Sequence, residues 1–216
     1  MAHDRRLDGA ARLAAALICS LPMTASAEDG PAPRGEQPSQ ATLCDLSAWI
    51  ADDAPAGLAL RAGPGTDFPA VAAVPPPYSD GAENYLPEAS ITGSSNGWFR
   101  ISRIVTNLYG GAPGDPVTAF SGEGWLPGDV LGLWVEAGSL RSRPSSDAPL
   151  AYSFGQEADG ETGGEAEGET GGPDAFAVER LLACDGLWVE VEGSYAGDRP
   201  RGWTGDVCAN QVTTCP

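Results

Sequence analysis

The stretch Leu60-Arg-Ala-Gly-Pro-Gly-Thr-Asp-Phe-Pro69 returns later in the chain as Leu140-Arg-Ser-Arg-Pro-Ser-Ser-Asp-Ala-Pro149. The two segments align without a gap, and Leu, Arg, Pro, Asp and Pro stand at the same places in both. Their composition indicates chain reversal, because Pro fixes φ, Gly permits positive φ and Asp can hydrogen-bond its own backbone. A repeat of this kind predicts two copies of one small domain.

Two further blocks repeat in the same order. Trp98-Phe-Arg-Ile101 matches Trp188-Val-Glu-Val191, and a Gly-Trp pair follows each of them, in Gly124-Trp-Leu126 and in Gly202-Trp-Thr204. The spacing between the blocks differs from one copy to the other. Loops of different length between the same elements explain that difference.

The elements of each copy are predicted to be strands. Val, Ile, Trp and Phe gather in short runs bounded by Gly, Pro, Asn and Asp. Asn96-Gly97 and Asp185-Gly186 are tight-turn signals just before the two Trp blocks. No apolar stripe of helical period persists after the N-terminal segment, so an all-β fold is expected.

These residues carry a family resemblance. Leu58-Ala-Leu-Arg-Ala-Gly-Pro-Gly-Thr-Asp-Phe-Pro-Ala-Val71, followed by the Trp98 block and by Gly124-Trp-Leu126, resembles the bacterial SH3-like (SH3b) domain. The first copy covers residues 43–136. The second covers 137–216 and departs from the family pattern, with Arg143 where Gly is usual. The resemblance implies two small, strongly bent barrels of the kind that bind cell-wall peptides or serve as targeting modules.

Strand alternation predicts which side chains face outward. If Phe99 and Ile101 face the core, Trp98 and Arg100 lie on the outer face. In the second copy the same argument buries Leu187, Val189 and Val191 and places Trp188 outside.

The ligand-binding candidates are therefore aromatic, with one Arg beside them. They are Trp98, Arg100, Trp125, Trp188 and Trp203. The simpler interpretation is that each Trp lies over a neighbouring loop and closes one end of its barrel. The alternative is an aromatic platform for a peptide or a glycan.

The N-terminus predicts export. Residues 1–27 begin with Arg5 and Arg6, continue with a short apolar stretch and end in Ala25-Ser26-Ala27, which is the order of a cleaved signal peptide. Residues 28–42 are predicted to be a disordered leader. The acidic, Gly-rich residues 156–174 are predicted to be a solvated insert in the second domain. The expected location is the periplasm or the extracellular space, with no membrane span.

Four cysteines remain after the signal peptide, which indicates two disulfides. If one strand runs from Leu182 to Glu192 and the next hairpin turns at Ala196-Gly197, Val191 pairs with Gly202. Cys184 then lies level with the region of Cys208. This register favours Cys184–Cys208 with Cys44–Cys215. The other two connectivities, Cys44–Cys208 with Cys184–Cys215 and Cys44–Cys184 with Cys208–Cys215, stay open.

Composition excludes several functions. The chain has a net charge of −18, no Lys, and one His, which is His3 in the signal peptide. Nucleic acid is therefore not expected as a partner, and His- or Lys-based catalysis is excluded in the mature chain. Neither a metal site nor a cofactor is expected, and the adjacent Asp52-Asp53 pair is a poor candidate for glycoside hydrolysis because its side chains diverge.

The expected function is that of a non-catalytic binding module of the periplasm or cell envelope. Its ligand would be a peptidoglycan peptide or glycan, or a protein partner. The alternative is a disulfide-stabilised structural or inhibitory protein that binds a single protein partner.

Overall fold

The residues that the computed structural model describes belong to one compact unit, residues 38–216. They are residues 41–51, 57–79, 84–106, 116–155 and 175–211. The predicted signal peptide, the acidic insert, Asp52-Asp53 and Cys215 lie outside the described residues. So does the predicted leader, except that the first strand already begins at Thr42. The described part of the chain contains no helix with the length and apolar character that a membrane crossing requires.

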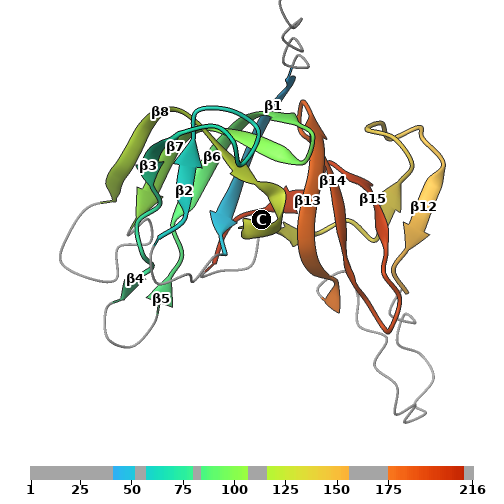
Figure 1. Cartoon of the computed structure of the whole chain (residues 1–216). Coiled ribbons are helices and arrows are strands. Elements are labelled where there is room, and N and C mark those ends of the chain that lie inside the picture. Colours follow the sequence, from blue (N-terminus) through green and yellow to red (C-terminus); the bar gives the residue numbers. More distant parts are fainter. Residues whose placement is uncertain (1–40, 52–56, 80–83, 107–115, 156–174, 212–216) are drawn as a thin grey trace, which may run out of the picture. The chain divides into compact units, whose positions relative to one another are not determined.

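The described residues form strands and one turn of 3₁₀ helix, η1 (Gly128–Val130), so the predicted all-β class is confirmed (Figure 1). The first large sheet is antiparallel and has seven strands, in the order β3 (Ala70–Ala73), β2 (Ala59–Arg61), β8 (Val117–Pro127), β7 (Trp98–Thr106), β6 (Glu88–Ser95), β1 (Thr42–Ile50) and β9 (Leu131–Gly132).

The second large sheet is also antiparallel and has five strands, in the order β12 (Leu150–Ser153), β11 (Ser139–Arg141), β15 (Arg201–Thr204), β14 (Trp188–Ser194) and β13 (Ala177–Asp185). Two small sheets complete the described strands. They pair β10 (Trp134–Val135) with β16 (Val207–Cys208), and β4 (Tyr78–Ser79) with β5 (Asn84–Tyr85).

The two large sheets repeat one strand order. The run β3-β2-β8-β7-β6 of the first corresponds to β12-β11-β15-β14-β13 of the second. Likewise β9, which follows β8, pairs with β1, and β16, which follows β15, pairs with β10. We call β1–β9 the first repeat and β10–β16 the second repeat. The sequence repeat is therefore also a repeat of strand pairing, and β10 joins it ahead of residue 137.

The repeated L-R-x-x-P stretch forms the same hairpin twice. In the first repeat, Arg61 Nη1 donates a hydrogen bond to the Phe68 carbonyl at 2.8 Å. In the second repeat, Arg141 Nη1 donates to the Ala148 carbonyl at 3.2 Å. The backbone bond that closes each loop measures 2.9 Å in both. The repeated Arg thus holds the loop of its own hairpin.

The repeated Leu and the repeated Gly-Trp pair meet in the core. Leu60 and Leu140 are fully buried. A Cβ on Gly124 would lie 2.3 Å from Leu60 Cγ, and a Cβ on Gly202 would lie 2.8 Å from Leu140 Cβ. Glycine stands at this position of each repeat because the strand passes directly over the Leu side chain.

The predicted turns are found at their predicted places. Asn96 and Gly97, with φ of 53° and 76°, join β6 to β7, and two positive φ values are what a type I′ turn requires. Gly186, with φ of 60°, begins the turn between β13 and β14. The predicted register of the last hairpin is also confirmed, since Val191 pairs with Gly202.

The favoured disulfide pairing is wrong. It assumes a strand that continues through residue 186, but the turn at Gly186 reverses the chain and puts Cys184 on β13. Because β13 and β15 lie on opposite sides of β14, Cys184 is far from the end of β15. It is bonded to Cys44 of β1 instead, with a Cα–Cα distance of 5.8 Å. This excludes Cys184–Cys208 and Cys44–Cys215, and Cys208 has a disulfide of its own.

The Cys44–Cys184 bond joins the two repeats, and hydrogen bonds accompany it. The Asp45 N–H donates to the Gly186 carbonyl and the Gly186 N–H donates to the Leu43 carbonyl, both at 2.9 Å. The Cys184 N–H donates to Ser94 Oγ at 2.9 Å. Buried side chains of both repeats form one core cluster. The second repeat is therefore fixed to the edge of the first.

Candidate functional site

Trp188 and Trp203, two of the five predicted ligand-binding residues, line the same pocket in the second repeat. The pocket has a volume of about 370 Å³, and most of its surface is apolar. Its lining residues come from β11 and the segment before it, the β11–β12 loop, the first residue of β14 and the turn before it, and β15 with the residues after it. They are Ala137, Ser139, Arg141, Ser146, Leu187, Trp188, Trp203, Thr204, Gly205 and Asp206.

The predicted burial pattern is correct within the strands and wrong at one turn. Phe99 and Ile101 are fully buried, as are Val189 and Val191. Leu187, predicted to be buried, is 61% exposed. It belongs to the turn between β13 and β14, so the alternation of β14 does not reach it. Its exposed side chain forms part of the pocket wall instead.

The two indoles of the pocket are placed by backbone geometry. A Cβ on Gly205 would lie 3.3 Å from Trp188 Cε2, so the Trp188 ring lies against the backbone of Gly205. Trp203 of β15 is directly opposite Arg141 of β11 and Glu190 of β14. Directly opposite residues of antiparallel strands project to the same face. Trp203 is therefore flanked by a cation and an anion.

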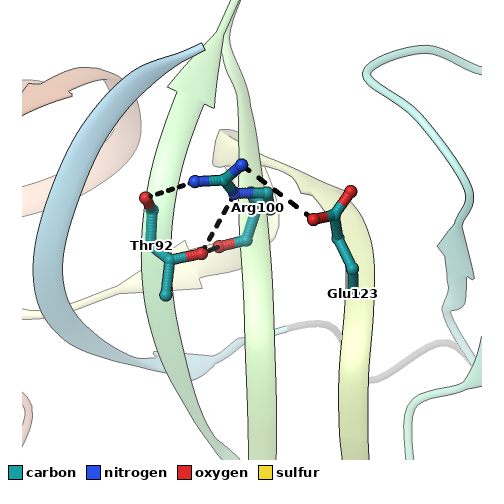
Figure 2. Close-up of polar contacts among 3 residues, drawn as sticks. All are labelled: Thr92, Arg100 and Glu123. Atoms are coloured by element: carbon teal, nitrogen blue, oxygen red, sulfur yellow. Dashed lines mark hydrogen bonds and ion pairs between the residues drawn. The ribbon is translucent and has the colours of Figure 1, made fainter.

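An ion pair beside each Gly-Trp strand has opposite polarity in the two repeats. Arg100 of β7 lies 3.9 Å from Glu123 of β8 (Figure 2). At the corresponding positions of the second repeat, Glu190 accepts a hydrogen bond from Arg201 Nε at 2.9 Å. That hydrogen bond raises the pKa of Arg201 above its ordinary value. Arg100 is further held by Thr92, whose Oγ1 and carbonyl accept its hydrogen bonds at 3.1 and 2.9 Å.

The remaining candidates, Trp98, Arg100 and Trp125, lie in the first repeat, outside this pocket. Trp125 is only 6% exposed, whereas its counterpart Trp203 is half-buried. Trp125 is directly opposite both Arg61 and Arg100, so two cations flank it in place of a cation and an anion. The outer faces of the two repeats therefore differ in charge and in access to the indole.

The turn after the Gly-Trp strand explains why the two repeats differ. Trp203-Thr-Gly-Asp206 is one residue shorter than Trp125-Leu-Pro-Gly-Asp129. With the extra residue, β8 extends until Pro127 pairs with Trp98, and the Gly128 N–H donates to the Gly97 carbonyl at 2.9 Å.

Gly128 is also covered by the second repeat. A Cβ there would lie 1.9 Å from the Leu181 carbonyl oxygen of β13. The corresponding Gly205 is exposed, and the pocket lies beside it.

Sequence reasoning missed four residues that matter for the surface. Arg141 and Asp206 line the pocket; Arg141 stands in the repeated L-R-x-x-P block, and Asp206 lies two residues after the Gly-Trp block. Trp49 and Trp134 form a tilted ring pair with centroids 5.1 Å apart, and Trp134 is 46% exposed. Trp49-Ile50 and Trp134-Val135 each precede an L-R block, so extending the repeat alignment toward the N-terminus would have found them.

Among the described residues, no group of three or more His, Cys, Asp or Glu side chains is placed to hold a metal ion. Comparison of the chain with protein-family models, curated proteins and solved structures finds no match. The pocket and the difference between the two repeats are therefore the features that bear on function.

Proposed function

We propose that the chain is an exported, non-catalytic binding protein built from two tandem SH3-like barrels, which recognises a peptidoglycan peptide or glycan, or a protein partner, in the cell envelope. The observation that carries the proposal is the pocket formed around Trp188 and Trp203. A small number of polar groups around an apolar, aromatic surface is the usual composition of a ligand site. The repeated strand order supports a duplicated binding domain.

Sedimentation with isolated murein sacculi tests the proposal. The mature protein should sediment with sacculi, and Trp188→Ala and Trp203→Ala should each reduce the bound fraction at least fivefold. Trp98→Ala is the matched control, because Trp98 has the same strand position in the first repeat, and its bound fraction should stay near that of the wild type. Circular dichroism confirms that each variant is folded. Wild-type protein that remains in the supernatant would argue against wall binding.

Zymography on murein tests the non-catalytic part of the proposal. A purified sample should give no clearing band, because the mature chain has neither His nor Lys and its sequence has no nucleophile motif. A clearing band that persists through repeated purification contradicts it.

The second candidate is a disulfide-stabilised structural or inhibitory protein with one protein partner. The Cys44–Cys184 bond between the repeats favours it, because a rigid pair of sheets can present a preformed surface. Exposed apolar side chains outside the pocket, Leu43, Val117 and Leu150, offer contact area. Retention of one envelope protein by the immobilised chain, in an extract free of murein, distinguishes this candidate from wall binding.

A further inference from the structure

The charges of the pocket lie at its two ends. Three lining residues stand at alternate positions in the segment that leads into β11 and in β11 itself: Ala137, Ser139 and Arg141. Arg141 is directly opposite Trp203. The Asp206 carbonyl accepts a hydrogen bond from the Glu136 N–H at 3.1 Å. Asp206 is therefore level with the beginning of this segment, while Arg141 stands at its other end, next to the hairpin loop.

The Asp206 end suits a cation. The Trp188 ring lies against Gly205, the residue just before Asp206, so the indole and an acidic residue lie close together at this end of the pocket. An ammonium group gains both from the opposite charge and from the electron-rich face of the indole. The net charge of −18 favours the approach of cationic groups in general.

The Arg141 end suits a carboxylate. Arg141 Nη1 is held by the Ala148 carbonyl, and the guanidinium has further N–H donors in a planar fork that matches a carboxylate. The pocket lining at this end also includes Ser146 of the hairpin loop. Leu187, Trp188 and Trp203 also line the pocket and offer apolar contact to a ligand.

We infer that this pocket binds a short zwitterionic peptide, with its ammonium group at Asp206 and Trp188 and its carboxylate at Arg141 and Ser146. The inference rests on the proposed function and names the ligand class of its site. A volume of about 370 Å³ is at the small end for ligand pockets. An extended tripeptide, about 10 Å between its charged ends, is of suitable length.

Titration with three peptides, followed by Trp fluorescence, tests the inference. Trialanine carries both charges, N-acetyl-trialanine lacks the ammonium group and trialanine amide lacks the carboxylate. Trialanine should bind, and each blocked peptide should bind at least tenfold more weakly. Equal binding of the three peptides, or no saturable binding of trialanine, overturns the inference.

Variants assign each charge to its end of the pocket. Asp206→Asn should remove the difference between trialanine and its acetylated form and keep the difference from the amide. Arg141→Gln should remove the difference between trialanine and its amide and keep the difference from the acetylated form. Because Arg141 also holds its hairpin, Ser146→Ala serves as a second variant at the same end and should weaken trialanine more than the amide. Asp129→Asn and Arg61→Gln, the first-repeat counterparts, should leave all three titrations unchanged.

Sedimentation with sacculi, on the same preparations, distinguishes a failure of the zwitterion site from a failure of the proposed function. Protein that binds sacculi but discriminates none of the peptides disproves the zwitterion site alone, whereas protein that binds neither disproves both proposals. If trialanine binds and displaces the chain from sacculi, wall peptides are the source of the ligand. If it binds without displacement, soluble peptides are the source, and the zwitterion site stands in either case.

Discussion

The difference in sequence between the two repeated hairpins has a local cause. A Cβ on Gly63 would lie 2.4 Å from the ring of Phe68, which packs over this glycine. In the second repeat Arg143 stands where Gly63 stands, and Ala148 stands where Phe68 stands. Without a ring above it, the position accepts a large side chain. The two substitutions are therefore coupled, and the hairpin bond from the repeated Arg is kept in both loops.

The glycine before each repeated Trp has a stricter requirement. We predict that Gly124→Ala lowers the free energy of unfolding by ~1–3 kcal/mol, the cost of overpacking a core. The new methyl group would lie 2.3 Å from Leu60 Cγ, and Leu60 is fully buried. Chemical denaturation measures the change.

The control for this variant is Gly138→Ala. A Cβ on Gly138 would meet no heavy atom within 4 Å, and its φ is not positive. The control should change stability by less than ~0.5 kcal/mol, as surface substitutions do. If the two alanine variants are equally stable, the contact between the Gly-Trp strand and the repeated Leu does not limit this position.

At the level of elements, turn chemistry decides where sequence reasoning is correct. The fold class, the turns and the β14–β15 register follow from alternation and from Asn-Gly or Ala-Gly reversals, which act between neighbours. The error at Cys184 came from extending one strand through Asp185-Gly186, although that pair is itself a turn signal. The turn places the residues before it, Cys184 among them, on a different strand with different neighbours, so a small local mistake changed a long-range contact.

The site was predictable only in part for a similar reason. Periodicity places Trp188 on the outer face of its strand, but it does not say which loops approach it. The pocket depends on a turn that is one residue shorter than its counterpart, between Trp203 and Asp206. Solvent access to an indole depends on such loop lengths and on the packing of one repeat over a turn of the other. The residue pattern of a single strand predicts neither of them.

The acidic insert joins elements whose ends already meet. Phe154 and Phe176, on either side of the insert, are both buried, and their ring centroids are 5.0 Å apart. Tyr195 packs on Phe154 with a centroid distance of 5.0 Å, and its hydroxyl accepts a hydrogen bond from the Gly155 N–H at 3.1 Å. These contacts hold together the described segments on either side of the insert.

We therefore predict that replacing residues 156–174 with a short Gly-Ser linker changes the melting temperature by less than ~5 °C, which corresponds to roughly 1–2.5 kcal/mol in a compact unit of this size. Loop closure entropy changes slowly with loop length, and the removed residues offer no large apolar side chain to bury. Phe176→Ala in the full-length chain is the comparison and should lower the melting temperature further, because it opens a cavity in the core. A larger drop for the deletion than for Phe176→Ala contradicts the prediction.

At the scale of the whole molecule, the two repeats are not equivalent. The turn of the first repeat at Gly128 is buried against β13, whereas the corresponding turn of the second repeat borders the pocket. Because the second repeat covers the turn of the first, only the corresponding turn of the second repeat stays accessible among the described residues. The Cys44–Cys184 bond and the hydrogen bonds beside it keep this arrangement in place.

The Cys44–Cys184 bond should contribute strongly to the stability of the fold. Cys44→Ala with Cys184→Ala should leave the secondary structure intact but lower the free energy of unfolding by up to ~5 kcal/mol, the chain-entropy estimate for a large closed loop. The bonded residues are 140 positions apart in the chain, so the bond constrains most of the unfolded protein. The single variant Cys184→Ala should be no more stable than the double variant. A double variant as stable as the wild type contradicts the prediction.

Digestion of the unreduced protein after Arg checks the pairing itself, since the chain has no Lys and Pro200 protects Arg199 from cleavage. A Cys44–Cys184 bond links peptide 35–61 to peptide 181–201 and leaves peptide 202–216, which holds Cys208 and Cys215, as a separate species. Either of the other two connectivities joins all three peptides into one species. The mass of the linked product therefore decides between them, and a three-peptide species would exclude the bond between the repeats.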